Sequence, residues 1–327
     1  MKVDIVKYRW FWFGFSLAVL IPGLIAIGIC IAQYGAPIKL GLDFTGGTKL
    51  EYKFTNKVEI EDVRKVLDKH DLVGSNIQVS KASEDGSQVV IIRSKAISER
   101  KSSETELSQK ELVDNDLKQS LGEFQILSID TVSPIIGPEL LRAGMLALVF
   151  TLLGIVSYIS YRFKRDYAVC AIIALLHDVF ILIGLFSIFS LAWGLEIDSL
   201  FITAALTVIG FSVHDTIVVF DRIRENSKYL GKNKSFGDIA NDSINQTLVR
   251  SINTSLTTLI TLGTLYLFGG ETTKNFVGAM FLGIASGTYS SIFVASALLV
   301  WWRELAKKRK KADSKVTSKK ELTSVAR

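Results

Sequence analysis

Long apolar stretches separated by shorter charged segments dominate this chain of 327 residues. An α-helix needs about 20 apolar residues to cross the hydrocarbon layer of a membrane. Six stretches of about this length occur: Trp10–Ala32, Leu140–Ile159, Ala168–Leu191, Leu200–Phe220, Ser251–Phe268 and Phe276–Trp302. The pattern predicts a polytopic α-helical membrane protein with six transmembrane helices, the first at residues 10–32 and the other five within residues 140–302. The first stretch is too long for the apolar part of a signal peptide, so we expect it to be retained.

Residues 33–139, between the first two apolar stretches, have the mixed pattern of a folded soluble domain. Alternation of apolar and polar residues predicts strands at 48–54, 76–81, 88–94 and 124–132, with a turn at 84–86. Helical spacing predicts helices at 59–70 and 103–121. The order β-α-β-β-α-β is that of a ferredoxin-like α+β domain. The apolar residues expected to point inward from the first and last of these strands are Leu50, Tyr52, Phe54, Phe124, Ile126 and Ile129.

Positive charge in the short loops predicts the orientation. Three basic residues lie in 161–167 and six in 221–250, whereas 192–199 and 269–275 together contain only Lys274. Loops rich in Lys and Arg stay in the cytoplasm. We therefore expect both termini, including residues 1–9, to be cytoplasmic and the 33–139 domain to be extracytoplasmic.

Composition agrees with a membrane protein, since 49% of the residues are hydrophobic. The net charge of +6 does not indicate nucleic-acid binding, because ten of the 38 basic residues lie in the tail 303–327. We expect this basic cytoplasmic tail to be disordered. It is either a stop-transfer and topology signal or a contact for anionic membrane lipid. Cys30 and Cys170 lie in apolar stretches, which suggests neither a disulfide nor a metal site.

Two pairs of ionisable residues lie inside predicted membrane helices, where charge is costly and often functional. His177 and Asp178 are in the middle of the third helix, and His214 and Asp215 are in the fourth. Asp215 is the stronger candidate for proton handling, because Ser212 can lie beside it and Arg250 opens the next helix. The alternative for a mid-membrane Asp is a satisfied hydrogen bond between helices. His177 and Asp178 could equally fix the rotation of their helix.

A polar stripe follows one face of the fifth predicted helix, at intervals of three and four residues. Facing Asp215, this stripe could hold a chain of waters that carries protons. Alternatively, each threonine hydroxyl bonds to its own backbone one turn earlier. The stripe consists of Arg250, Thr254, Thr257, Thr261 and Thr264.

Small residues mark two further places. Ala279, Gly283 and Gly287 line one face of the sixth helix, which favours close packing within the bundle over a subunit interface. The run 41–47, just after the first helix, contains glycines suited to positive φ or close backbone approach, and an aspartate that can cap a turn. It lacks the lysine and the strand-to-helix context of a phosphate loop. The residues of interest in this run are Gly41, Asp43, Gly46 and Gly47.

Four segments carry a resemblance to a known family. Residues 41–47 look like its signature after the first span, and 205–226 closely resemble its fourth-span motif. Residues 243–255 and 286–293 resemble its later motifs. Over residues 10–302 the chain is similar to the SecF family of protein-export proteins, within the resistance-nodulation-division superfamily.

The resemblance implies an accessory subunit of the Sec protein translocase in the bacterial inner membrane. Such a subunit pairs with SecD, joins the SecYEG translocon, with YajC and YidC as further candidate partners, and holds an unfolded polypeptide while the proton gradient completes export. The family's functional aspartate and arginine fall on Asp215 and Arg250. His214 stands where many members have Asn, which bears on the operating pH.

Two alternatives remain open beside the proton-driven export subunit. One is a non-transporting scaffold whose soluble domain is a passive clamp. The other is half of a small-molecule efflux pump, which a single domain of about 100 residues disfavours because such pumps carry larger substrate domains. Nothing in the sequence suggests an enzyme or a cofactor.

Overall fold

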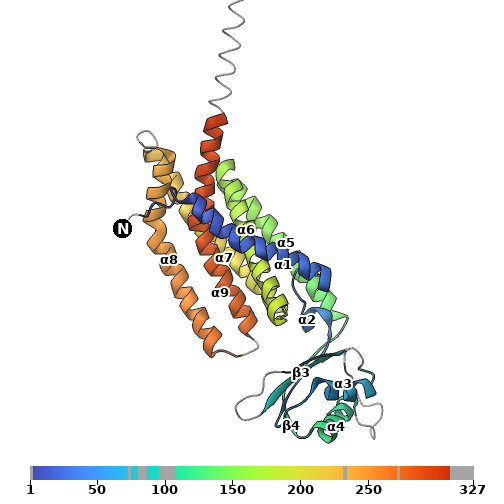
Figure 1. The fold of residues 1–327 in the computed structure, drawn as a ribbon. Coiled ribbons are helices and arrows are strands. Elements are labelled where there is room, and N and C mark those ends of the chain that lie inside the picture. The colour runs from blue at the N-terminus through green and yellow to red at the C-terminus, as the bar shows by residue number, and fades with distance from the viewer. Residues whose placement is uncertain are drawn as a thin grey trace, which may run out of the picture. The chain divides into compact units, whose positions relative to one another are not determined.

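The computed structural model describes residues 3–72, 75–79, 87–95, 97, 108–230, 234–270 and 273–309. The chain forms two compact units (Figure 1), one from Leu40–Leu146 and the other from Met1–Lys39 with Ala147–Arg327. The turn expected at 84–86, the first residues of the helix expected from 103, and the tail from 310 onward lie outside the described residues.

The larger unit is a bundle of long helices. Their bounds are α1 Arg9–Tyr34, α5 Ile136–Arg162, α6 Arg165–Trp193, α7 Ser199–Leu230, α8 Phe236–Phe268 and α9 Lys274–Tyr289. After α9 comes a π-helical turn, η2 (Ser290–Ala295), and the helix continues to Arg309. Each of the six apolar stretches of the sequence lies within one of these helices.

Five of the long helices are apolar and long enough to cross a membrane, and α8 is not among them. With 33 residues α8 is long enough. Its second half, however, carries several threonines and serines and Asn253, which lower its mean hydropathy. Within the described residues, length and composition therefore support five spans. The expected span Ser251–Phe268 is not apolar enough to be counted among them.

Close packing of the bundle depends on small residues. A Cβ added at Gly184 of α6 would lie 2.7 Å from the Cα of Gly23 in α1, so these helices touch backbone to backbone. On α9, a Cβ at Gly283 would lie 2.4 Å from the Val208 side chain of α7. The face formed by Ala279, Gly283 and Gly287 thus packs inside the bundle, against α7, as the sequence predicted.

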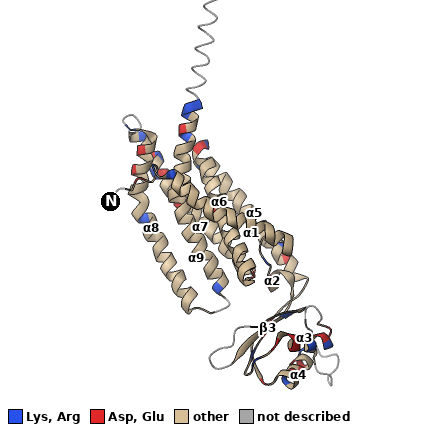
Figure 2. Ribbon diagram, viewed as in Figure 1, with Lys and Arg blue, Asp and Glu red and all other residues tan. Residues whose placement is uncertain are grey.

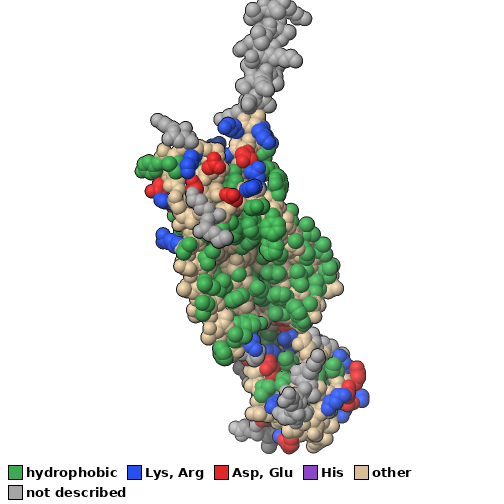
Figure 3. Space-filling model, turned by 60° about the vertical axis from the view of Figure 1, so that its left-hand side comes forward, with side chains coloured by type: hydrophobic (Ala, Val, Ile, Leu, Met, Phe, Trp, Pro, Cys, Tyr) green, Lys and Arg blue, Asp and Glu red, His purple; other side chains and the backbone are tan. Residues whose placement is uncertain are grey.

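Charged and apolar side chains are sorted along the helical unit. Charges gather near the helix ends, where Arg303 pairs with Asp166 at 2.6 Å and Arg162 with Asp221 at 3.0 Å (Figure 2). Between the ends the surface is covered by hydrophobic side chains (Figure 3), and Phe150 of α5 is 68% exposed. Such an apolar belt between charged ends is the surface expected of a protein in a bilayer.

The smaller unit contains a four-stranded antiparallel sheet in the order β2-β3-β1-β4. Two helices, α3 and α4, supply buried Val63, Leu67, Val113 and Leu117 to its core. Ser108 caps α4, accepting from the Glu111 amide. The bounds are β1 Gly47–Phe54, α3 Ile60–Lys69, β2 Asn76–Val79, β3 Gln88–Ser94, α4 Gln109–Leu121 and β4 Phe124–Val132.

The inward residues of β1 are those predicted, but one on β4 is not. Leu50, Tyr52 and Phe54 are fully buried, and Phe124 and Ile129 pack against the same core. Ile126 is 40% exposed although it pairs with the buried Tyr52, so it is not buried as predicted. β4 is an edge strand, which leaves Ile126 partly uncovered. A register shift between Glu51 and Tyr52 gives β4 one extra residue, which brings Ile129 opposite Leu50.

The glycine run forms a tight connection ahead of β1. Gly41 is the N-cap of the short helix α2 (Leu42–Thr45), which places Asp43 in the first turn rather than at the cap. Gly46 and Gly47 follow with φ of 69° and 121°, and a Cβ at either would lie within 2.6 Å of neighbouring backbone. Positive φ and close approach therefore both require glycine here, as the sequence predicted.

We expect Gly184→Val to destabilise the bundle by about 1–3 kcal/mol, because the added methyl groups force α1 away from α6. Gly28→Val in α1 is the matched control, since a Cβ there meets nothing within 4 Å. The measurement is the thermal unfolding midpoint of the purified protein in detergent. Equal midpoints for the two variants would contradict the close contact.

Candidate functional site

Two carboxyl groups are buried in the middle of the helical unit. Asp178 on α6 is 2% exposed and Asp215 on α7 is 4% exposed. A carboxylate in a low-dielectric interior must be hydrogen-bonded, paired or protonated. The groups around each carboxyl therefore determine what it can do.

Asp178 is surrounded by three hydrogen-bonding side chains. Its Oδ2 accepts from Ser212 Oγ of α7 at 2.5 Å and from Ser290 Oγ of η2 at 2.6 Å. Its Oδ1 lies 2.9 Å from Nδ1 of His177. Ser212 was expected beside Asp215, one turn away on the same helix. That assignment was wrong, because the Ser212 hydroxyl points to the neighbouring helix instead.

The π-helical turn carries two consecutive serines that are both buried. Ser290 and Ser291 are each 0% exposed, in a segment of the helix that is largely buried. Ser291 Oγ donates to the Ser212 carbonyl at 3.3 Å and lies 2.8 Å from the Thr216 hydroxyl. Such turns are often found at functional sites.

Asp215 has a sparser environment. Thr288 of α9 donates to its Oδ2 at 3.3 Å, and the Ser255 hydroxyl of α8 lies 2.6 Å from Thr288 Oγ1. Both hydroxyls also lie within 2.9 Å of a carbonyl of their own helix. Because each hydroxyl has one proton and more than one acceptor, the chain Ser255–Thr288–Asp215 can reorganise when Asp215 gains or loses a proton.

The polar stripe of α8 does not face Asp215. Its threonines are exposed, and their hydroxyls donate to carbonyls of the same helix at 2.9–3.0 Å. The buried face instead carries Ser251, Ser255 and Leu262. These residues follow Arg250, Thr254 and Thr261 by one position, a rotation of about 100°. The expectation that the stripe lines a water path to Asp215 was therefore wrong, and the self-bonded alternative is the one observed.

Arg250 and His214 are exposed, unlike the two carboxyls. Among the described residues no ion pair joins Arg250 to Asp215. Four hydroxyl groups of these networks were missed in the sequence. Thr288 and Ser290 contact the carboxyls directly, whereas Ser255 contacts Thr288 and Ser16 contacts His177. The signal that could have found them is a lone polar residue on the small, buried face of an apolar helix.

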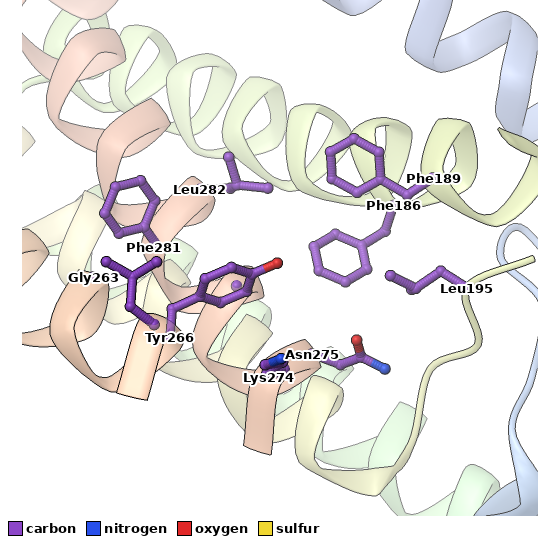
Figure 4. Close-up of a pocket in the computed structure, with 11 residues that line it drawn as sticks. Phe186, Phe189, Leu195, Gly263, Tyr266, Lys274, Asn275, Phe281 and Leu282 are labelled. Carbon is purple, nitrogen blue, oxygen red and sulfur yellow. The ribbon is translucent and has the colours of Figure 1, made fainter. Parts of the chain in front are cut away.

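A separate cavity of about 460 Å³ lies between α6, α8 and α9 (Figure 4). Aromatic residues such as Phe186 and Tyr266 line it, with Lys274 and Asn275 from the start of α9. Neither buried carboxyl is among its lining residues. This cavity is therefore distinct from the polar centre of the bundle, by which we mean Asp178, Asp215 and the groups hydrogen-bonded to them.

Comparison with known proteins identifies the family. Residues 112–305 match the model of the C-terminal part of the SecD/SecF protein export membrane proteins, and residues 32–58 match the SecD/SecF GG motif. The chain belongs to the SecD/SecF family. The GG motif of this family contains Gly46 and Gly47, the two glycines whose positive φ was described above.

Relatives within the SecD/SecF family align over nearly the whole chain. A protein translocase subunit SecF from Synechocystis is 43% identical over 93% of this chain and 95% of its own length. One from Thermobaculum terrenum is 44% identical over 92% and 94%. The crystal structure of SecDF from Thermus thermophilus, described as a translocon-associated membrane protein, has a TM-score of 0.72 and 33% identity over 93% of this chain. This chain covers 39% of that longer one. It is thus a multi-pass membrane protein of a bacterial protein-transport family.

Replacing Thr288 by the near-isosteric valine should destabilise the bundle by about 1–3 kcal/mol, because Asp215 and Ser255 lose their shared partner. Thr261→Val is the control, since that hydroxyl is exposed and bonds only within α8. The readout is the denaturant midpoint of each variant in detergent. If Thr261→Val lost as much stability as Thr288→Val, the assignment of Thr261 to the exposed face of α8 would be contradicted.

Proposed function

We propose that this chain is the SecF-type subunit of a Sec protein translocase, and that it uses the proton gradient to complete export of unfolded polypeptides. The observation that carries the proposal is Asp215 of α7, a buried carboxyl at the end of a chain of reorienting hydroxyls from α8 and α9. The relatives of this chain are named translocase subunits. One charge moved through 100 mV supplies about 2.3 kcal/mol. A few protons per cycle can therefore drive a change in helix packing.

The topology that we propose has six spans, with α8 as the fifth. In it α8 crosses beside α7 and α9, which it contacts. In this topology the basic loops and both termini lie in the cytoplasm, and the membrane is the inner membrane. The β2-β3-β1-β4 sheet with α3 and α4 is then an extracytoplasmic ferredoxin-like domain, in a position to hold the emerging polypeptide.

We also assign the exposed polar face of α8 to the contact with a SecD-type partner. A SecDF relative from Thermus thermophilus, in which this chain covers 38% of the length, supports such a pairing. A polar side chain that faces lipid costs free energy, most of all at the bilayer centre and less near the interface. A partner helix that offers acceptors to Arg250, near the cytoplasmic end of the span, and to Asn253 would remove that cost. The SecYEG translocon is the further partner that we propose.

Asp215→Asn should abolish the gradient-dependent part of export, because the amide cannot load and release a proton. Export of a secreted precursor into inverted membrane vesicles, with and without a proton gradient and at matched subunit abundance, measures the effect. Asp68→Asn, on the exposed side of α3, controls for the loss of one negative charge. If Asp215→Asn still responds to the gradient, the carboxyl is structural and the scaffold alternative takes over.

Single cysteines test the partner face. Thr261→Cys on α8 should form a disulfide cross-link to cysteines in the membrane helices of the SecD-type partner, whereas Val149→Cys on α5 should not, although both positions are exposed. The products are separated by gel electrophoresis. Cross-linking from Val149→Cys alone would place the partner on the other side of the bundle.

A further inference from the structure

A chain of hydrogen bonds leads from Asp178 to a second cavity. His177 Nδ1 lies 2.9 Å from Asp178 Oδ1, and His177 Nε2 contacts the hydroxyl of Ser16 on α1. An ionised carboxylate can only accept, so Nδ1 donates and Nε2 accepts from Ser16. We propose that Asp178, His177 and Ser16 form a second proton path of this translocase subunit, which links the polar centre of the bundle to the cavity between α1, α6 and α9. The proposal rests on the proton-driven function proposed above.

The cavity has a volume of about 260 Å³ and is bordered by Ser16 and His177 themselves. Its other polar lining residues are Ser286 and Tyr289 of α9, and the Tyr289 hydroxyl donates to the Trp12 carbonyl at 2.8 Å. One water needs about 30 Å³ and two or more polar partners. The cavity therefore has room and partners for water next to Ser16.

Each proton transfer along this path balances without any other reactant. A proton carried by water in the cavity, as hydronium, passes to Ser16 Oγ and leaves a neutral water, as the Ser16 proton passes to His177 Nε2. The His177 Nδ1 proton then passes to Asp178 Oδ1, which leaves a neutral acid and a neutral imidazole protonated at Nε2. Release of the proton in the opposite direction restores the starting state.

The π-helical turn connects this path to Asp215. Ser290 donates to Asp178, and Thr288, two residues earlier, donates to Asp215. Ser290 Oγ also lies 3.1 Å from the Gly287 carbonyl. When Asp178 is protonated, Ser290 can turn its proton to Gly287 and accept from the acid instead. One segment of α9 and η2 therefore responds to the protonation of both carboxyls.

Among the described residues, few other titratable groups lie near this pair. Asp215 is on α7, whose Ser212 donates to Asp178, and Tyr289 of α9 lines the same cavity as His177. Charged residues of α1, α6 and α9 such as Arg9, Asp166 and Arg303 lie near the helix ends.

A Ser–His–Asp chain also occurs in hydrolases, but the surroundings here favour proton transfer. Acyl transfer requires backbone or side-chain donors at the developing oxyanion. Ser16 lies in the middle of α1, where backbone N–H groups donate to carbonyls within the helix. The serine is thus placed to pass a proton and not to stabilise a tetrahedral intermediate.

The test compares variants in vesicles that contain the whole translocase, with gradient-dependent export measured between about pH 5 and 8. His177→Gln and Ser16→Ala should lower the gradient-dependent rate by about tenfold or more, and His177→Gln should also flatten its pH dependence. Ser16→Thr, which keeps the hydroxyl, should restore most of the rate. Ser157→Ala, on the exposed side of α5 and away from the path, should behave as the parent. If His177→Gln does not accumulate in the membrane, the Ser16 variants decide.

Two results would overturn the path while the proposed function stands. Either His177→Gln and Ser16→Ala export as the parent does while Asp215→Asn is inactive, or both lower the rate but keep the parent's pH profile, as a structural role would. A gradient response that survives in Asp215→Asn would instead remove the proposed function, and the second path with it.

Discussion

The bundle depends on burying two carboxyl groups where water cannot solvate them. An uncompensated charge in such a place costs several kcal/mol, so its partners must be held in position by the fold. The charge of Asp178 is compensated by hydrogen-bond donors from its own helix, from α7 and from η2. Because each hydrogen bond fixes the rotation of another helix, the carboxyl sets the mutual orientation of three central helices. Asp215, whose hydrogen bond from Thr288 is long at 3.3 Å, has more freedom to rearrange.

Small residues make these hydrogen bonds possible. Hydroxyl groups of serine are short and reach a carboxyl on another helix only if the backbones approach closely. Gly287 provides that approach, since a Cβ there would lie 3.0 Å from Ser212 Cβ. The glycine contacts and the polar centre therefore depend on each other. Where one helix has glycine, the polar side chains of the next helix can come close enough to form hydrogen bonds.

Sequence periodicity located elements well and partners poorly. Apolar length gave the long helices, and alternation gave the four strands, because both depend on local burial alone. Ser212 was paired with Asp215 rather than with Asp178, since spacing along one helix cannot say which neighbour a side chain meets. The polar stripe of α8 was predicted to face Asp215, but the buried face of the helix lies about 100° away, one residue further along. Ile126 lies on an edge strand and stays exposed although its alternation predicted burial, and the π turn at Ser290 has no periodic signature.

The low hydropathy of α8 bears on how the protein is made. A segment that carries Asn253 and several hydroxyls gains little by entering lipid alone. The bonds from its threonines to their own helix recover part of the cost. The remainder has to come from neighbours, and α7 and α9 are the helices synthesised just before and just after it. Insertion of α8 is then cooperative. The helix enters the bilayer stably only when α7 is already inserted or when α9 follows it.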